Sequence, residues 1–187
     1  MPGSNAVYTV RDCARAIIDA IGDAPGDATA VGAAIREPMH RLIGRPDLLM
    51  LGVPRQGNNV AQSYYLYLDD EMSILLFEVP KGKPIQPHDH GIWESLYVYR
   101  GRIKHTLYRR ADDDAVPGVA ELAIVDDRVL ERGEGTVVAP PNDIHGFTAL
   151  TEETYGLTVV NGRYKADRHY YQPDQKTYVI RPQRNAR

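Results

Sequence analysis

The sequence predicts an all-β protein, either a sandwich or a barrel, with a helical segment in front of the strands. Short apolar runs rich in β-branched and aromatic residues recur from residue 61 onward, separated by Gly, Pro, Asn and Asp. Before residue 61, apolar residues recur at three- and four-residue spacing. A chain of 187 residues is expected to form one domain with a sizeable core. We therefore expect a helical N-terminal segment and wrapping connection over residues 1–60 and a barrel over residues 61–182.

Two helices are expected in the N-terminal segment. Thr9 is a candidate cap for the first helix, and Asp27 or Thr29 can start the second. The second helix is expected to end or kink at Pro38, because proline has no backbone N–H to donate. Residues 44–60 contain several Gly and Pro residues and predict an irregular connection. The helices are expected to cover one outer face of the barrel.

The second part of the chain reads as a series of short strands. Aspartate-, glycine- and proline-containing segments separate them, and Pro140 to Asp143 forms a turn in front of His145. The tail from Asn161 holds several tyrosines, of which Tyr164 is expected either over the barrel mouth or against the outer sheet. The expected strands are residues 64–68, 73–79, 96–99, 102–109, 119–125, 128–130, 136–139, 147–150 and 155–160.

Three histidines and a glutamate form a candidate metal site. Because side chains alternate along a strand, His88 and His90 point to the same face, while Asp89 points away and is not expected to be a ligand. Glu94 keeps the same parity, and His145 comes from a later strand. Three imidazoles and one carboxylate suit a borderline first-row ion, namely Fe(II), Mn(II), zinc or nickel. Calcium and magnesium prefer sites built from oxygen ligands.

The same residues carry a resemblance to a known superfamily. The first cupin motif, G-x5-H-x-H-x3-E-x6-G, fits at each defined position: Gly82, His88, His90, Glu94 and Gly101. The second motif, G-x5-P-x-G-x2-H-x3-N, fits in part, at Pro140 and His145. Its two glycines and final asparagine are replaced by Glu134, Asn142 and Ala149. The chain thus resembles the cupins, which implies a double-stranded β-helix, or jelly-roll barrel, around a metal ion held by the motif residues.

Within the cupins, the segment PHDHGIW and the strand before it resemble the cysteine-dioxygenase-like thiol dioxygenases, over the stretch from Tyr64 to Val160. The resemblance implies Fe(II), dioxygen and a small thiol substrate such as cysteine or 3-mercaptopropionate. The chain departs from that branch by retaining Glu94 and by having no arginine in AQSYYLYLDDEM. Gly156, Thr158 and Val160 also stand where the branch carries a Ser-His-Tyr set.

The ligand set leaves the reaction open. A four-ligand site leaves about two positions free on a six-coordinate ion, which suits an Fe(II) oxygenase, in particular a dioxygenase, that binds a small molecule and O2 side by side. Glu94 is expected to be a ligand or a general base, and is thus also the candidate catalytic residue. The alternatives are an isomerase, decarboxylase or hydrolase that uses manganese or zinc, and a metabolite-binding cupin without turnover.

Four further side chains are candidates for the pocket around the ion. Trp93 and Phe147 lie next to predicted ligands, and Tyr164 lies in the tail. His105 shares a strand face with Ile103 and Leu107, so it either supports the site, acts as a base, or is a hydrogen-bonded barrel histidine.

Composition excludes several classes of partner. The formal net charge of −3 gives no reason to expect binding to nucleic acid or to an anionic membrane. The single cysteine, Cys13, cannot form an intrachain disulfide and is expected to be a buried structural thiol. No apolar run reaches the length of a membrane span. We expect a cytoplasmic protein, either a monomer or a homodimer, that acts on a small molecule.

Overall fold

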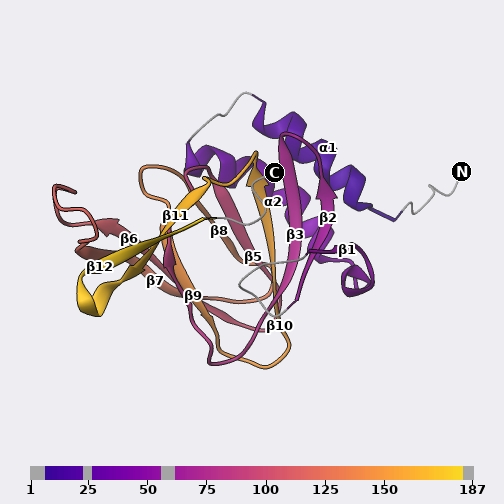
Figure 1. The fold of residues 1–187 in the computed structure, drawn as a ribbon. Coiled ribbons are helices and arrows are strands. Elements are labelled where there is room, and N and C mark those ends of the chain that lie inside the picture. Colours follow the sequence, from indigo (N-terminus) through magenta and orange to yellow (C-terminus); the bar gives the residue numbers. More distant parts are fainter. Residues whose placement is uncertain (1–6, 23–26, 56–61, 183–187) are drawn as a thin grey trace, which may run out of the picture.

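The structure is a computed structural model that describes residues 7–22, 27–55 and 62–182. The expected boundary between residues 60 and 61 lies outside these ranges. The described chain starts with helices α1 (Val10–Ile21) and α2 (Ala28–Ile43), and twelve strands follow them among the described residues (Figure 1). Two short 3-10 helices, η1 (Leu48–Met50) and η2 (Pro173–Gln175), interrupt the connections. Among the described residues, no helix has the length and apolar character needed to cross a membrane.

The two helices begin as the sequence predicts. The Thr9 hydroxyl accepts a hydrogen bond from the backbone of Asp12, and the Asp12 carboxylate accepts one from the backbone of Thr9. The Asp27 carboxylate caps α2 by accepting hydrogen bonds from the backbone N–H groups of Thr29 and Ala30. Of the two outcomes expected at Pro38, an end or a kink, the end is wrong, because the helix continues to Ile43. Its last turn buries apolar side chains completely, and this packing outweighs the hydrogen bond that proline cannot donate.

The strands form two six-stranded antiparallel sheets. Sheet A contains, in spatial order, β1 (Val53–Pro54), β2 (Ser63–Leu68), β3 (Met72–Val79), β10 (Thr154–Asn161), β5 (Glu94–Arg100) and β8 (Gly135–Val138). Sheet B contains β12 (Thr177–Pro182), β11 (Asp167–Gln172), β4 (Ile85–His88), β9 (Ile144–Ala149), β6 (Ile103–Arg110) and β7 (Leu122–Leu130).

Strands that are distant in sequence are neighbours in both sheets. In sheet A, β10 pairs with β3 on one side and β5 on the other, and in sheet B, β9 lies between β4 and β6. The two sheets curve around a shared interior (Figure 1). This arrangement is a jelly-roll barrel with a helical N-terminus, which confirms the expected fold class.

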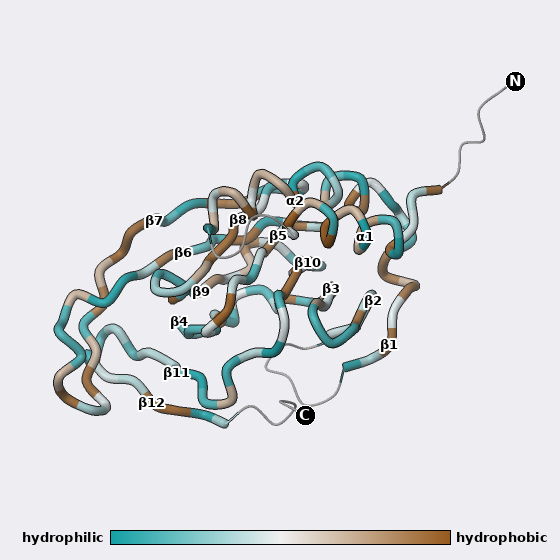
Figure 2. Tube along the Cα trace, turned by 90° about the horizontal axis from the view of Figure 1, so that it is seen from above, coloured by the Kyte–Doolittle hydropathy of each residue, from teal (hydrophilic) through white to brown (hydrophobic). Residues whose placement is uncertain are grey.

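The helices cover the outer face of sheet A, as expected (Figure 2). A core cluster joins Ile17 and Leu42 of the helices to Ile74, Leu76 and the neighbouring side chains of sheet A. A second cluster lies between the sheets and contains Phe77, Val79, Leu96, Val98, Ile103, Leu130, Phe147 and Ala149. Along β9 the inner face passes from Ala149 and Phe147 of this cluster to His145, so one part of the barrel interior is apolar and the next is polar.

Two strand predictions need correction. The structure joins residues 122–125 of the first expected segment and the second segment, 128–130, into one continuous strand, β7, while residues 119–121 precede it; the aspartates at 126 and 127 lie in this strand at the edge of sheet B. The tail also forms β11 and β12, which extend sheet B beyond β4. The presence of β11 affects the candidate site, because this strand pairs with β4, which carries His88.

Candidate metal centre

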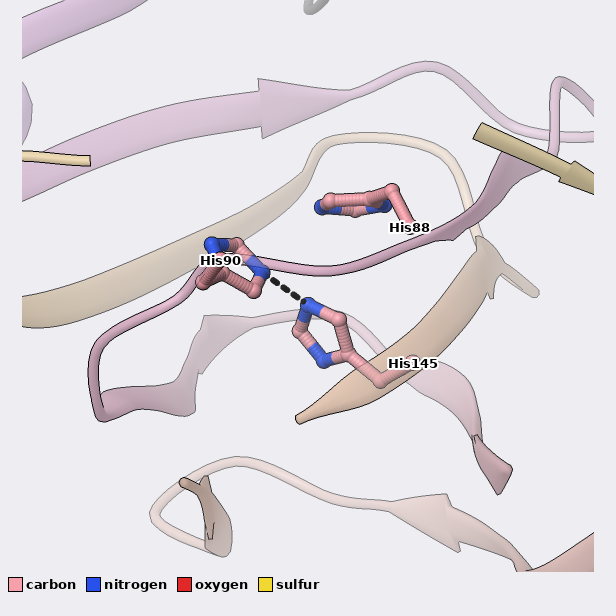
Figure 3. Close-up of side chains that lie close together, drawn as sticks. All are labelled: His88, His90 and His145. Carbon is pink, nitrogen blue, oxygen red and sulfur yellow. Dashed lines mark hydrogen bonds between the residues drawn. The ribbon is translucent and has the colours of Figure 1, made fainter. Parts of the chain in front are cut away.

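Three histidines from the two predicted motifs meet inside the barrel. His88 ends β4, and its residue partner across the sheet is His145 of β9. His90 follows two residues after His88, and all three side chains converge in Figure 3. Their candidate ligand atoms all lie within 4.8 Å of one another, and each residue is at least nine-tenths buried. The cluster therefore joins two parts of the chain that are more than 50 residues apart.

Hydrogen bonds orient two of the rings. The Nδ1 atom of His88 is 2.8 Å from the carbonyl oxygen of Gln86, so His88 donates from Nδ1 and leaves Nε2 free. Nδ1 of His145 is 2.9 Å from Nε2 of His105, while its own Nε2 lies 2.8 Å from Nε2 of His90 (Figure 3). The Nδ1 atoms of His88 and His145 are thus held by hydrogen bonds to other parts of the chain, and their Nε2 atoms remain available. Histidines that bind a metal are commonly held in this way through their second nitrogen.

The donor set fits a first-row metal ion. Burial lowers the pKa of His88 to about 3 and the pKa values of His90 and His145 well below their usual range, so the rings are neutral at physiological pH. Metal–nitrogen bonds of about 2.1 Å place adjacent ligands of a six-coordinate ion about 3.0 Å apart. The 2.8 Å between the Nε2 atoms of His90 and His145 is close to that spacing. The cluster can therefore hold a metal ion.

His105 stands behind the cluster and holds His145. It is fully buried on β6, where Leu107 is the residue that pairs with His145. Burial lowers the pKa of His105 to about 4, so its ring is neutral. Its second nitrogen, Nδ1, is buried without a hydrogen-bond partner among the described residues. Of the roles expected from the sequence, the geometry matches support of a ligand from behind.

Glu94 lies beside the cluster and contacts one of its rings. Gly91 adopts a positive φ of 72°, a bend that returns the chain to β5, where Glu94 is the first residue. The Glu94 Oε2 atom accepts a hydrogen bond of 2.5 Å from the Tyr164 hydroxyl and lies 3.2 Å from Nδ1 of His90. Burial raises the pKa of Glu94 to about 7, although the Tyr164 hydrogen bond and the charge of Arg168 lower it. The Glu94 carboxylate does not belong to the group of candidate ligand atoms, from His88, His90 and His145, that lie within 4.8 Å of one another.

Arg168 is a site residue that the sequence reasoning missed. It lies on β11, is 7% exposed, and donates from Nε to the carbonyl oxygen of Asp89 at 2.8 Å. Its Nη2 atom is 2.9 Å from Nδ1 of His90. The guanidinium forms no ion pair with a carboxylate in the part of the chain that the structure describes. The alternation of Arg168 and Tyr170 along the tail was the available signal, but it does not distinguish Arg168 from the other tail arginines.

Nδ1 of His90 lies near two groups that favour different protonation states of this nitrogen. The Glu94 carboxylate, 3.2 Å away, can contact Nδ1 favourably only when Nδ1 carries a proton, whereas Nη2 of Arg168 can only donate to an unprotonated Nδ1. If His90 binds a metal through Nε2, its proton must sit on Nδ1 and face Glu94. Nη2 of Arg168 then has no acceptor on the ring and is free to bind another group.

The other predicted pocket residues have distinct positions. Tyr164 packs its ring 5.3 Å from that of His90, and the Phe147 ring lies 5.6 Å from that of His145. Trp93 instead packs in the cluster between the helices and sheet A, because residues 93 and 94 point to opposite faces of the chain. Asp89 points away from the cluster, as expected, and its carboxylate accepts a hydrogen bond from the backbone of His169.

Comparisons with known proteins concern the barrel. No family model and no curated protein match the sequence. KdgF from Halomonas sp. superposes with a TM-score of 0.45 and 17% identity, over 60% of this chain and 94% of its own. An RmlC-like cupin from Shewanella frigidimarina superposes with a TM-score of 0.44 and 17% identity, over 59% of this chain and 84% of its own. A cupin superfamily protein from Desulfitobacterium hafniense superposes with a TM-score of 0.40 and 16% identity, over 56% of this chain and 82% of its own.

Proposed function

We propose that the protein is an Fe(II)-dependent dioxygenase that uses O2 to oxidise a small thiol carrying a carboxylate, such as cysteine or 3-mercaptopropionate. One observation carries the proposal. Three neutral imidazole donors lie beside a buried guanidinium, that of Arg168, which forms no ion pair among the described residues. A metal site next to an unpaired buried cation suits a substrate that has both a metal-binding group and an anionic group.

The metal part of the proposal rests on the three histidines. These three imidazoles would hold the ion and would leave coordination positions for the substrate and O2. When bound, iron supplies the binding positions for the thiol and O2 and the redox chemistry between them. His105 keeps the proton of His145 on Nδ1, away from the metal-binding nitrogen.

The substrate part rests on Arg168. A buried cation without a counter-ion is costly, so a bound anion stabilises it more than it would an exposed arginine. A guanidinium can bind both oxygens of a carboxylate at once, which orients the substrate as well as holding it. The proton arrangement at His90 described above leaves Nη2 of Arg168 available for this contact when the metal is present.

Glu94 and Tyr164 complete the polar side of the site. Glu94 either binds the ion or accepts the thiol proton at a carboxylate oxygen, and the Tyr164 hydroxyl holds this carboxylate in place. On the other side, Phe77, Val98 and Phe147 belong to the apolar interior of the barrel. These side chains exclude water from the reacting groups.

The direct test is oxygen uptake by protein purified without a metal-binding tag. Its metals are quantified first, and uptake is then followed with cysteine, 3-mercaptopropionate and, for comparison, enols and diketones. The proposal expects iron and thiol-dependent uptake, both lost in His145→Ala. Uptake that is unchanged in His145→Ala would count against the site. Manganese or zinc with turnover but no oxygen consumption would instead support a non-redox enzyme.

A pair of arginine variants tests the substrate class. Arg168→Met should raise KM for a carboxylate-bearing thiol by about tenfold or more, because a charge-assisted hydrogen bond is lost. Cysteamine, which has no carboxylate, should be affected much less. Arg181→Met is the matched control, since Arg181 is the partner of Arg168 on β12 and is exposed. An equal effect of both variants, or an equal effect on both thiols, would remove Arg168 as the carboxylate-binding residue.

A further inference from the structure

A groove lies on the outside of the barrel, between α2 and the edge of sheet A. It has a volume of about 930 Å3 and is bounded by one face of α2, by the end of β7, and by the turn into β8. Figure 2 shows α2 lying along the β8 side of the barrel. Neither the three histidines nor Arg168 lines it. We call it the α2–β8 groove.

Small residues on both walls keep the groove open. A side chain at Gly135 would bring its Cβ within 2.6 Å of the Tyr97 ring, so the glycine lets Tyr97 form the floor. On the helix side, Gly32 faces Val137, and a Cβ there would lie 3.4 Å from Val137 Cγ2. The two walls are therefore close at Gly32 and are lined by longer, charged side chains elsewhere.

Positive charge predominates in the lining. Arg36, Arg128 and Arg132 line the groove, and Glu134 is the acidic lining residue, although the protein as a whole has a formal charge of −3. Arg128 pairs with Asp126 at 3.0 Å. Arg132 donates from Nη2 to the carbonyl oxygen of Ile43 at 2.9 Å instead of pairing with a carboxylate. Arg36 forms no ion pair with any residue that the structure describes. Within the described ranges, the guanidiniums of Arg36 and Arg132 thus have no carboxylate partner.

Tyr97 adds an unpaired hydrogen-bond donor at the floor. Its side chain lines the groove but the residue is only 4% exposed, and its ring packs edge-on against His40 at 6.3 Å. Its hydroxyl makes no hydrogen bond within the described ranges of the chain. Burial raises the pKa of Tyr97, so the hydroxyl stays protonated. The hydroxyl oxygen reaches the solvent of the groove, where it can donate a hydrogen bond to an external acceptor.

We propose that the α2–β8 groove binds a small molecule that carries a carboxylate or phosphate group. Arg36 and Arg132 bind the anionic group, and the Tyr97 hydroxyl donates a further hydrogen bond. The volume falls within the range of about 300–1,000 Å3 that is usual for small-molecule sites. The site is independent of the metal centre, because Tyr97 and Glu94 lie on opposite faces of β5.

The test is a titration of the full chain, as purified, with citrate and with inorganic phosphate, followed through backbone amide NMR signals. The amides of Gly32, Gly133 and Gly135 report on the groove, while those of Gly91 and Gly146 report on the metal centre. The proposal expects saturable shifts at the groove glycines with at least one probe. The tighter probe decides between a carboxylate and a phosphate ligand. Shifts confined to the metal-centre glycines, or none up to roughly 20 mM of either probe, would overturn it.

Variants connect the shifts to the named side chains. The double variant Arg36→Gln/Arg132→Gln should weaken probe binding about tenfold or more, and Tyr97→Phe about two- to tenfold. Arg109→Gln, an exposed arginine on β6, is the matched control and should leave binding unchanged. Thermal unfolding of each variant checks that it is folded, since Arg132 also donates a hydrogen bond to the carbonyl oxygen of Ile43. Equal affinity of the wild-type protein and the double variant would contradict the assignment.

Discussion

Nε2 of His105 lies 2.9 Å from Nδ1 of His145, on the side of the His145 ring that faces away from His90. The contact links β6 to β9 across neighbouring strands and leaves His145 with one free nitrogen, Nε2, directed into the cluster. His105, which is not one of the three clustered histidines, therefore determines which nitrogen of His145 is available to a metal ion.

The first prediction concerns this contact. His105→Leu should weaken metal binding about 10- to 100-fold, because the ring of His145 loses the acceptor that fixes its tautomer and orientation. His105→Gln, whose side-chain oxygen can accept the same proton, should recover a large part of the affinity. Competition with a chelator measures both. Equal affinity in all three proteins would show that His105 is only a packing residue.

The second prediction concerns Glu94. Glu94→Gln should lower metal retention or turnover, because a neutral amide replaces the carboxylate that faces Nδ1 of His90. Tyr164→Phe should also lower metal retention or turnover, but by less, because it removes only the hydroxyl that donates to Glu94. Metal content and oxygen uptake are measured on the same samples. Full iron loading with full activity in Glu94→Gln would exclude Glu94 from the site.

The third prediction concerns the close packing of the barrel interior. Gly156→Ala should destabilise the protein by about 1–3 kcal/mol, because the added Cβ would meet the Phe77 ring at 2.7 Å. Denaturant unfolding measures the change. In a Phe77→Leu background the same substitution should cost less, since the ring is gone. Gly32→Ala in α2 is the control and should stabilise by about 0.5–1 kcal/mol, because its nearest neighbour would be at 3.4 Å.

The fourth prediction uses the pH dependence of stability. Cys13 is fully buried, and burial raises the pKa of its thiol from 9.0 to about 12. Above pH 9 the unfolded chain loses this proton while the folded chain keeps it, so stability is lost as pH rises. The free energy of unfolding of the wild-type protein, minus that of Cys13→Ala, should fall by about 2 kcal/mol between neutral pH and about pH 10.5. A difference that does not change with pH would mean that the thiol ionises equally in both states.

Local patterns account for much of what could be predicted. The caps of both helices and most strand positions follow from residues within a few positions of one another. Two local signals misled. Aspartates at 126 and 127 suggested a break in a strand that is continuous, because at a sheet edge acidic side chains can face water without interrupting the ladder. Pro38 suggested a helix end or a kink, but the helix does not end there, because tertiary packing stabilises its last turn.

The polar groups around the histidines could be predicted only in part from local sequence patterns. His88 and His90 were identifiable as candidate ligands from their spacing of two residues, although β4 ends at His88 and His90 lies just beyond it. Arg168 was not, because its role depends on β11 pairing with β4, a contact between segments about 80 residues apart. The support that His105 gives His145 depends likewise on the register of β6 against β9. Trp93, next to Glu94 in the chain, faces a different core.

The residues alone were enough to predict the barrel, its helical cover and the three imidazoles, since alternation, spacing and turn chemistry are properties of short segments. The folded chain was needed to find Arg168 beside His90, His105 behind His145, and the cationic groove beside α2. Each of these depends on which strands and helices become neighbours, and that is decided by how the whole chain buries its apolar faces.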